Sequence, residues 1–178
     1  MTTSLPGLTP GTWTVDSNHS EVGFVARHLM VAKVRGRFTN VSGTVTVTDP
    51  IEQSTVEVTA QMDSIDTRTA DRDTHLKSAD FFDIEKYPTM TFKSTSFDGK
   101  KLTGDLTIKD VTKPVTFDVE FSGVQADPWG ATKAGFEAEA NVDRTDWGLT
   151  WNAALEGGGV LVGEKVKLVI DVELLKTP

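Results

Sequence analysis

The stretch Ala134-Gly-Phe-Glu-Ala-Glu-Ala-Asn-Val142 decides the fold class. Apolar side chains occupy every second position, and glycine, glutamate or asparagine stands between them. A period of two is typical of a β-strand, because successive side chains of a strand point to opposite faces of the sheet. One face of this strand is therefore apolar and the other polar, which favours an antiparallel sheet with one wet side over a parallel sheet buried on both.

The same alternation recurs along most of the chain. It is clear in residues 41–48, 55–62, 102–108, 115–121 and 166–174, and weaker in residues 13–16, 20–26, 33–38 and 89–97. Eight or more such strands must bury their apolar faces, either against a second sheet or by closing on themselves. Closure also removes the exposed sheet edges, so we expect an all-β protein built as an extended eight-stranded antiparallel barrel.

One segment breaks the alternation. Residues 69–82 predict a helix of about three turns between the central strands, near the barrel mouth. Thr69 is a candidate N-cap, and Asp71 and Asp73 favour the positive end of the helix dipole. Pro88 then prevents the helix from continuing into the next strand.

The chain is long enough for one domain with a sizeable core, and no linker divides it. We expect residues 1–11 to form a flexible N-terminal tail and residues 12–178 the barrel domain. The opening residues lack the basic and apolar regions of a secretory signal peptide, so the sequence predicts a cytoplasmic protein. No apolar run is long enough to span a bilayer, and a net charge of −8 disfavours a nucleic-acid partner.

Residue types that carry chemistry are sparse. The chain has no cysteine, and His19, His28 and His75 show none of the spacings typical of metal ligands, so neither a metal site nor a cofactor is predicted. The run Asp16-Ser-Asn-His-Ser20 holds the residue types of a catalytic triad, but neighbours in a tight turn cannot face one another as a triad requires. A turn is the better interpretation, and no catalytic residue is predicted. An enzyme that uses His75 at the barrel mouth stays as an alternative, with no partner for this histidine apparent in the sequence.

The interior of an eight-stranded barrel can hold side chains or one small ligand. Small residues such as Gly36, Gly104 and Ala138 fall on the apolar faces, which favours an open interior, although small residues also relieve crowding where strands coil. An unpaired polar group in an apolar wall costs about 1–3 kcal/mol, so the expected guest is a long apolar molecule. The predicted lining is Phe24, Phe38, Val45, Val58, Met62, Leu76, Phe82, Phe92, Leu106, Phe117, Phe136, Ala138, Leu168 and Ile170. The alternative is a non-catalytic structural or interaction protein, with a solidly packed barrel that acts through its surface or a dimer face.

Four stretches carry a family resemblance. They are Trp13-Thr-Val-Asp16 with Val34-Arg-Gly36, then Arg72-Asp-Thr-His-Leu76 with Asp80-Phe-Phe-Asp83, then Gly104-Asp-Leu-Thr-Ile108, and last Asp143-Arg144 with Asp146-Trp-Gly148. In this combination the chain, from Trp13 to about Leu175, resembles the YceI-like family of polyisoprenoid-binding, lipocalin-like bacterial barrels.

The resemblance implies an extended lipocalin-like barrel, often a homodimer, that binds, stores or transports a lipid rather than turning it over. The implied ligand is a polyisoprenoid, an isoprenoid quinone or its precursor, or a fatty-acyl compound. Many relatives are exported to the periplasm. This chain differs from them in that its opening residues do not resemble a signal peptide. Arg72, His75 and Arg144 are candidates for contacts with the ligand head group; alternatively, the charged residues hold the helix and loop to the barrel end through charge-assisted hydrogen bonds.

Overall fold

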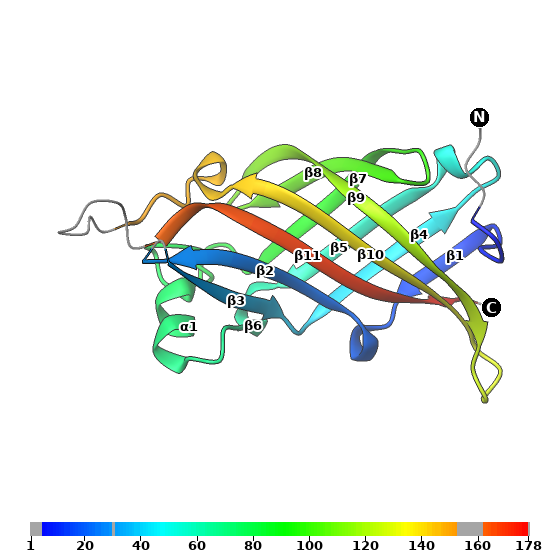
Figure 1. Ribbon diagram of the computed structural model, residues 1–178, viewed down its shortest axis with the longest axis horizontal. Coiled ribbons are helices and arrows are strands. Elements are labelled where there is room, and N and C mark those ends of the chain that lie inside the picture. Colours follow the sequence, from blue (N-terminus) through cyan, green and yellow to red (C-terminus); the bar gives the residue numbers. More distant parts are fainter. Residues whose placement is uncertain (1–4, 30, 153–161, 178) are drawn as a thin grey trace.

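The computed structural model describes residues 5–29, 31–152 and 162–177. It is an elongated sheet of antiparallel strands wrapped around a long axis, with one α-helix at one end (Figure 1). The strands are β1 (Gly11–Val15), β2 (Glu21–His28), β3 (Ala32–Phe38), β4 (Val41–Val47), β5 (Thr55–Gln61), β6 (Ile65–Asp66), β7 (Thr89–Phe97), β8 (Lys101–Ile108), β9 (Val111–Ala126), β10 (Thr132–Asp143) and β11 (Val162–Lys176). The helix is α1 (Ala70–Lys77), and the short 3₁₀ helices are η1 (Ser17–His19), η2 (Ile51–Gln53), η3 (Met62–Ser64) and η4 (Arg144–Trp147).

The sheet closes into the expected eight-stranded antiparallel barrel. Neighbouring strands pair in the order β1, β4, β5, β7, β8, β9, β10, β11, and β1 pairs in turn with β11. The closing contact is short and runs from Trp13 opposite Lys176 to Val15 opposite Leu174. Farther along the same edge, β11 pairs with β2, from Ile170 opposite Val22 to Val162 opposite His28. Strands β2, β3 and β6 therefore complete the wall at the end that carries α1.

The helix α1 is shorter than the sequence predicted. It ends at Lys77, because Ser78 turns the chain away and its hydroxyl donates a hydrogen bond to the carbonyl of His75 at 2.6 Å. Thr69 stands at the N-cap position, but its side chain makes no capping hydrogen bond. Its hydroxyl accepts a hydrogen bond from Arg72 at 3.2 Å instead. Within the described residues, neither α1 nor any 3₁₀ helix has the length to cross a membrane.

The end of the barrel opposite α1 is closed around Trp13. This side chain is fully buried, and its indole nitrogen donates to the carbonyl of Thr9 at 3.0 Å. Leu5 and Leu8 pack against the same cluster, so part of the segment expected to be a loose tail contacts the barrel. The Lys176 ammonium donates to the carbonyl of Thr9 at 3.2 Å and stands 5.1 Å from the centre of the Trp13 ring. The first and last strands are thereby held together where the barrel closes.

Candidate functional site: an apolar cavity along the barrel axis

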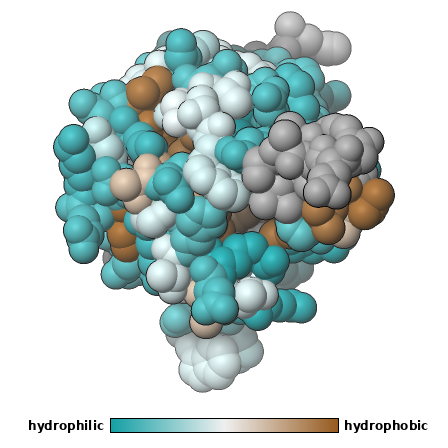
Figure 2. Space-filling model, turned by 90° about the vertical axis from the view of Figure 1, so that its left-hand side faces the viewer, coloured by the Kyte–Doolittle hydropathy of each residue, from teal (hydrophilic) through white to brown (hydrophobic). Residues whose placement is uncertain are grey.

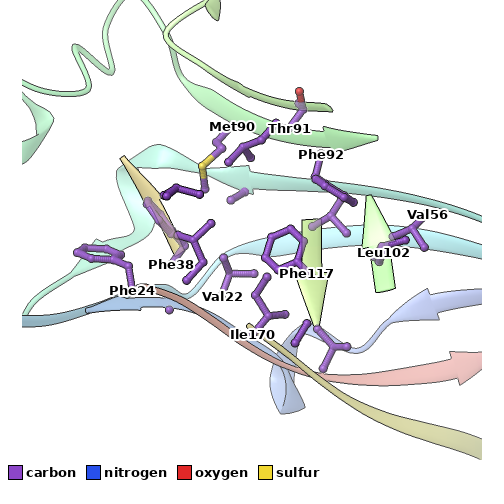
Figure 3. Close-up of a pocket in the computed structure, with 18 of the residues that line it drawn as sticks. Val22, Phe24, Phe38, Val56, Met90, Thr91, Phe92, Leu102, Phe117 and Ile170 are labelled. Carbon is purple, nitrogen blue, oxygen red and sulfur yellow. The ribbon is translucent and has the colours of Figure 1, made fainter. Parts of the chain in front are cut away.

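A cavity of about 260 Å³ runs inside the barrel. Its volume lies just below the range for small-molecule pockets, which is about 300–1,000 Å³. The lining extends from Leu8 and Ile51 at the Trp13 end to Leu76 and Trp147 at the α1 end, so the cavity is long and narrow. Figure 3 shows side chains from several strands directed into it, Phe117 and Ile170 among them.

Thirteen of the fourteen side chains that the sequence assigned to the lining are part of the cavity wall. Eleven of them lie on strands, where the inward positions alternate as the period of two requires. Leu76 lies on α1, and Phe82 lies in the turn after it. Met62 is not part of the wall. Strand β5 ends at Gln61, and Met62 begins η3, so the alternation stops one residue before it. Met62 packs with Phe38 and Ile65 in a buried cluster instead.

Two of the small residues expected to leave space are covered by aromatic rings. A Cβ atom at Gly36 would stand 2.2 Å from the ring of Phe24, and one at Gly104 would stand 2.4 Å from the ring of Phe92. Gly36 lies opposite Phe24 across the β2–β3 pair. These glycines accommodate the rings that form the wall. The space on the barrel axis depends instead on residues such as Ala138, which lies between Val119 and Ile170.

The wall formed by the described residues exposes almost no polar surface. Arg144 is one of few polar residues in the lining, and it is only 6% exposed. Its guanidinium donates to the carbonyls of Gly163 at 2.9 Å, Leu149 at 2.5 Å and Val162 at 3.2 Å. Burial lowers the pKa of Arg144, which remains far above neutrality for a guanidinium. Arg144 therefore holds η4 and the residues after it against β11.

Arg72 and His75 lie on α1 and are not part of the cavity lining. Arg72 donates to the hydroxyl of Thr67 at 2.8 Å and to its carbonyl at 2.6 Å. His75 contacts Asp80, with 2.9 Å between Nε2 and Oδ2. The His75 ring also meets Trp151 edge to face, at 4.6 Å between centroids. The partner Asp80 was not apparent in the sequence, because the turn after α1 brings it back onto the helix. The contact with Trp151 was not apparent either, because this residue comes from the distant segment after η4.

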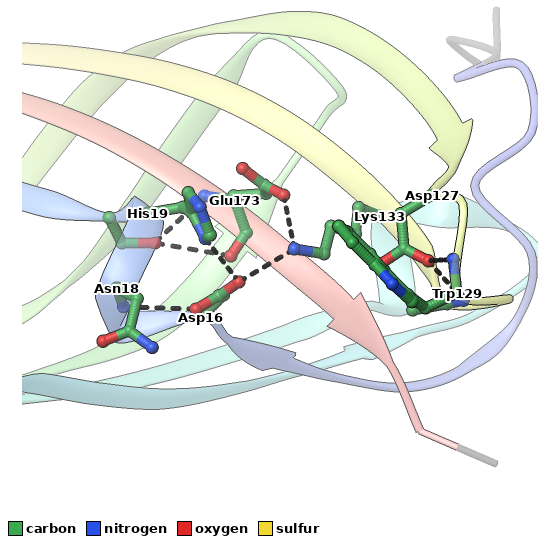
Figure 4. A network of polar contacts seen from close by, with 9 residues as sticks. Asp16, Asn18, His19, Asp127, Trp129, Lys133 and Glu173 are labelled. Atoms are coloured by element: carbon green, nitrogen blue, oxygen red, sulfur yellow. Dashed lines mark hydrogen bonds and ion pairs between the residues drawn. The ribbon is translucent and has the colours of Figure 1, made fainter.

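A second polar group, which sequence reasoning missed, lies on the outside of the barrel (Figure 4). The run from Asp16 to Ser20 forms a turn, as expected, but Asp16 also contacts Lys133 at 3.1 Å across 117 positions of sequence. Lys133 in turn contacts Glu173 at 3.0 Å. A hydrogen bond with His19 and the ammonium of Lys133 lower the pKa of Asp16, against desolvation, which raises it.

Asp16, His19 and Glu173 have ligand atoms within 4.8 Å of one another, a spacing that could hold a metal ion. Lys133 already supplies the positive charge that both carboxylates need, with contacts of 3.1 Å and 3.0 Å. A cation placed among them would be repelled by this ammonium. We therefore interpret the group as an ion-pair network that ties β1 and the η1 turn to β10 and β11.

Comparison with known proteins agrees with this architecture. Residues 13–174 match the model of the YceI-like domain. A UPF0312 protein of Staphylococcus aureus strain N315 is 41% identical over 165 residues, which cover 90% of this chain and 95% of that protein. The crystal structure of BcnA from Burkholderia cenocepacia superposes with a TM-score of 0.76 at 22% identity, covering 89% of this chain and 98% of that one. A polyisoprenoid-binding domain from Saccharophagus degradans, implicated in plant cell wall breakdown, superposes with a TM-score of 0.69 at 12% identity, covering 96% and 100% of the two chains.

Fold and site together define a class: a closed antiparallel β-barrel with an apolar cavity along its axis rather than a filled core. Within that class, the match over residues 13–174 and the 41% identity to the staphylococcal protein decide the assignment. The chain belongs to the YceI-like family.

Proposed function

We propose that this protein binds one long apolar lipid along the barrel axis, for storage or transport. The lipid is a polyisoprenoid, an isoprenoid quinone or its precursor, or a fatty-acyl derivative. The observation that carries the proposal is a long, narrow cavity whose wall exposes almost no polar surface. The similar barrel from Saccharophagus degradans is a polyisoprenoid-binding domain, which supports the same class of ligand.

The chemistry of the wall determines what can bind. Burying apolar surface contributes about 25 cal/mol per Å², whereas an unpaired polar group in such a wall costs about 1–3 kcal/mol. The hydrocarbon part of the ligand therefore occupies the axis, and its polar head lies at the α1 end. Arg72 and His75 are on α1 at this end. Thr67 holds the Arg72 side chain in position, and Asp80 holds that of His75. Both side chains are thereby placed to contact a ligand head group.

Catalysis is not part of the proposal. His75 has Asp80 as a partner, but it is outside the cavity lining, and the lining that the structure describes offers Ser54 and Thr91 as its only hydroxyl groups. A structural protein with a solid barrel is the alternative. It is disfavoured because side chains would then fill the axis, where the structure leaves about 260 Å³. The homodimer and the cytoplasmic location expected from the sequence stay predictions.

Blocking the axis tests the proposal. Ala138 faces the cavity, whereas the preceding residue, Glu137, is exposed on the outer face of the same strand. Ala138→Phe and Glu137→Phe therefore add the same ring inside and outside the barrel. We expect delipidated wild-type protein and Glu137→Phe to bind a fluorescent polyene fatty acid alike, and Ala138→Phe to bind it at least tenfold more weakly.

Stability separates the two interpretations of the interior in the same pair of variants. A ring that enters open space leaves the free energy of unfolding within about 1 kcal/mol of wild type, whereas overpacking a filled core costs about 1–3 kcal/mol. Equal lipid affinity of wild type and Ala138→Phe would contradict the proposal, as would a large loss of stability in Ala138→Phe alone.

A further inference from the structure

The exposed apolar residues of this protein are not scattered evenly. Among the described residues, four large apolar side chains are exposed, and two of them, Leu29 at 43% and Val31 at 80%, stand on the single turn that joins β2 to β3. The turn is closed by a hydrogen bond from the Val31 amide to the carbonyl of His28 at 3.2 Å. Leu29 adopts a left-handed backbone conformation, with φ of 54°, which a branched side chain rarely takes. Leu29 and Val31 are therefore both exposed at the tip of this turn. Leu29 is held there in a backbone conformation that is unfavourable for it.

The outer face of the same hairpin is cationic. Arg27 lies opposite Lys33, Val25 opposite Arg35, and Gly23 opposite Arg37. The intervening residues Phe24 and Ala26 line the cavity, so the basic side chains are on the outward face. Arg37 is neutralised by Glu21 at 3.3 Å and by Asp66 at 3.4 Å.

Among the described residues, the other three cations of this face have no such neutralisation. Arg27, Lys33 and Arg35 are exposed, and the ion pairs found in the described part of the chain include none of them. Three cations without an ion pair in the described part of the chain are distinctive in a protein whose net charge is −8.

The hairpin lies at the α1 end of the barrel. Figure 1 places the β2–β3 turn beside the loops around α1, and Figure 2, which looks onto this end, shows hydrophobic atoms exposed next to hydrophilic ones. Val162 pairs with His28 at the base of the turn and is part of the cavity wall. A partner surface that contacts the tip of this hairpin would therefore also face the α1 end of the cavity, where Leu76 lies.

We propose that the β2–β3 hairpin docks this protein onto an anionic lipid bilayer, with Leu29 and Val31 entering the headgroup region and Arg27, Lys33 and Arg35 facing the lipid phosphates. An apolar tip bordered by basic side chains has the composition that binds such surfaces, since apolar burial and attraction to anionic lipids act together. The two apolar side chains that the structure describes at this tip are too few for the core of a stable protein interface, which favours a bilayer over a protein partner. Docking would give lipid a route between the bilayer and the barrel, and that role rests on the proposed function. The docking itself does not depend on the proposed function.

The opposite end of the molecule supplies a matched control. Trp129, in the turn between β9 and β10, is 88% exposed and is the largest exposed apolar side chain among the described residues. The adjacent turn residue Asp127 is acidic, and its carboxylate accepts the Trp129 amide at 2.9 Å. Figure 1 places this turn at the end of the barrel away from α1. Trp129→Ser removes more apolar surface than either hairpin substitution, but without a cationic face beside it.

Co-sedimentation with vesicles of phosphatidylglycerol or of phosphatidylcholine tests the docking directly. Leu29→Asn with Val31→Asn removes the two exposed apolar side chains on which the proposal rests, and asparagine tolerates the left-handed backbone at position 29. Lys33→Glu with Arg35→Glu reverses the cationic face. We expect wild-type protein and Trp129→Ser to bind phosphatidylglycerol vesicles alike, and each double variant to bind at least fivefold less. Binding by wild type should also fall at least fivefold in 0.5 M salt, because salt screens exposed charges.

Several results would overturn the docking. They are wild-type protein that stays in the supernatant, equal binding to both vesicle types, or loss of binding in Trp129→Ser but not in the hairpin variants. A change of oligomeric state in Leu29→Asn with Val31→Asn, together with no vesicle binding by wild type, would identify the hairpin as a contact between two copies of the chain.

A separate lipid titration keeps the two proposals distinguishable. We expect the hairpin variants to bind the polyene fatty acid presented in ethanol as wild type does, because none of their substituted residues lines the cavity. Vesicle binding by a protein that takes up no lipid would support docking and contradict the proposed function. Lipid uptake without vesicle binding would support the proposed function and contradict the docking.

Discussion

At some positions of this barrel, the residue type is determined by the side chain that faces it across the sheet. Gly104 is buried, and a Cβ atom there would meet the Phe92 ring at 2.4 Å and the Lys93 carbonyl oxygen at 2.6 Å. Gly36 has the same relation to Phe24. In each case the missing side chain allows the far end of an aromatic ring to lie against the glycine, a device that stabilises curved sheets.

Adding a methyl group to Gly104 should therefore be costly. We expect Gly104→Ala to lower the free energy of unfolding by about 1–3 kcal/mol, because backbone and ring must both move. Gly130→Ala is a contrasting variant, since open space surrounds its Cβ position and the cost comes only from its positive φ of 88°. Urea unfolding of both variants measures the difference. A Gly104→Ala protein as stable as wild type would show that the Phe92 ring is not fixed in place.

The carboxylate of Asp16 predicts a pH dependence. Hydrogen bonds with His19 and Lys133 lower its pKa in the folded protein. The stability from this network is present above the pKa of an unfolded aspartate, about 3.9, and is lost as the pH falls through the lower folded value. We expect Asp16→Asn to reduce the free energy of unfolding by about 1 kcal/mol at pH 6 and to differ less from wild type below pH 4.

The exposed pair of Lys101 and Asp118 provides a control for this measurement. Both side chains are more than half exposed. We expect Asp118→Asn to change stability by less than about 0.5 kcal/mol at pH 6, since exposed ion pairs contribute little. An Asp16→Asn protein whose difference from wild type stayed constant from pH 6 to pH 3 would contradict the role of the ionised carboxylate.

At the scale of elements, the period of two predicted the strands and their inward faces, because that pattern is local. Closure was an inference from edge strands, and the register that closes the barrel, Trp13 opposite Lys176, was not predictable. The end of α1 at Lys77 and the partner of His75 depend on a turn formed by residues 78–83, where no simple period applies. The Asp16 network was missed for a different reason. Lys133 and Glu173 are 117 and 157 residues away from Asp16 in the sequence, and no local pattern indicates contacts over such distances.

The η4 segment should depend on one side chain. Arg144 joins it to β11 through the carbonyls of Gly163 and Val162, and it also binds Leu149. We expect Arg144→Met to lower the free energy of unfolding by about 2–4 kcal/mol, because buried carbonyls lose charged donors. Lys165→Met on the same strand is the control, since its side chain is 81% exposed and, among the described residues, its ion pair is with Asp143. Equal stability of the two variants would show that η4 is held by packing alone.

At the scale of the whole molecule, the cavity and the closed sheet belong together. An eight-stranded barrel has room for side chains or for one narrow guest, and the choice depends on residue sizes along the axis. Thirteen of the side chains that the sequence assigned to the lining are part of the cavity wall, and their role in ligand binding stays a prediction. The sequence did not show that Gly36 and Gly104 would be covered by rings, because that depends on pairing between strands.

The measurement that tests the central claim most directly is native mass spectrometry of the purified wild-type protein, followed by organic extraction and identification of what is released. We predict a population that is heavier than the bare chain by the mass of one long-chain lipid, which extraction returns as an isoprenoid or acyl compound. Ala138→Phe, prepared in the same way, should show the bare mass. A wild-type protein that carries no lipid and takes none up when isoprenoids and fatty acids are supplied would contradict the account.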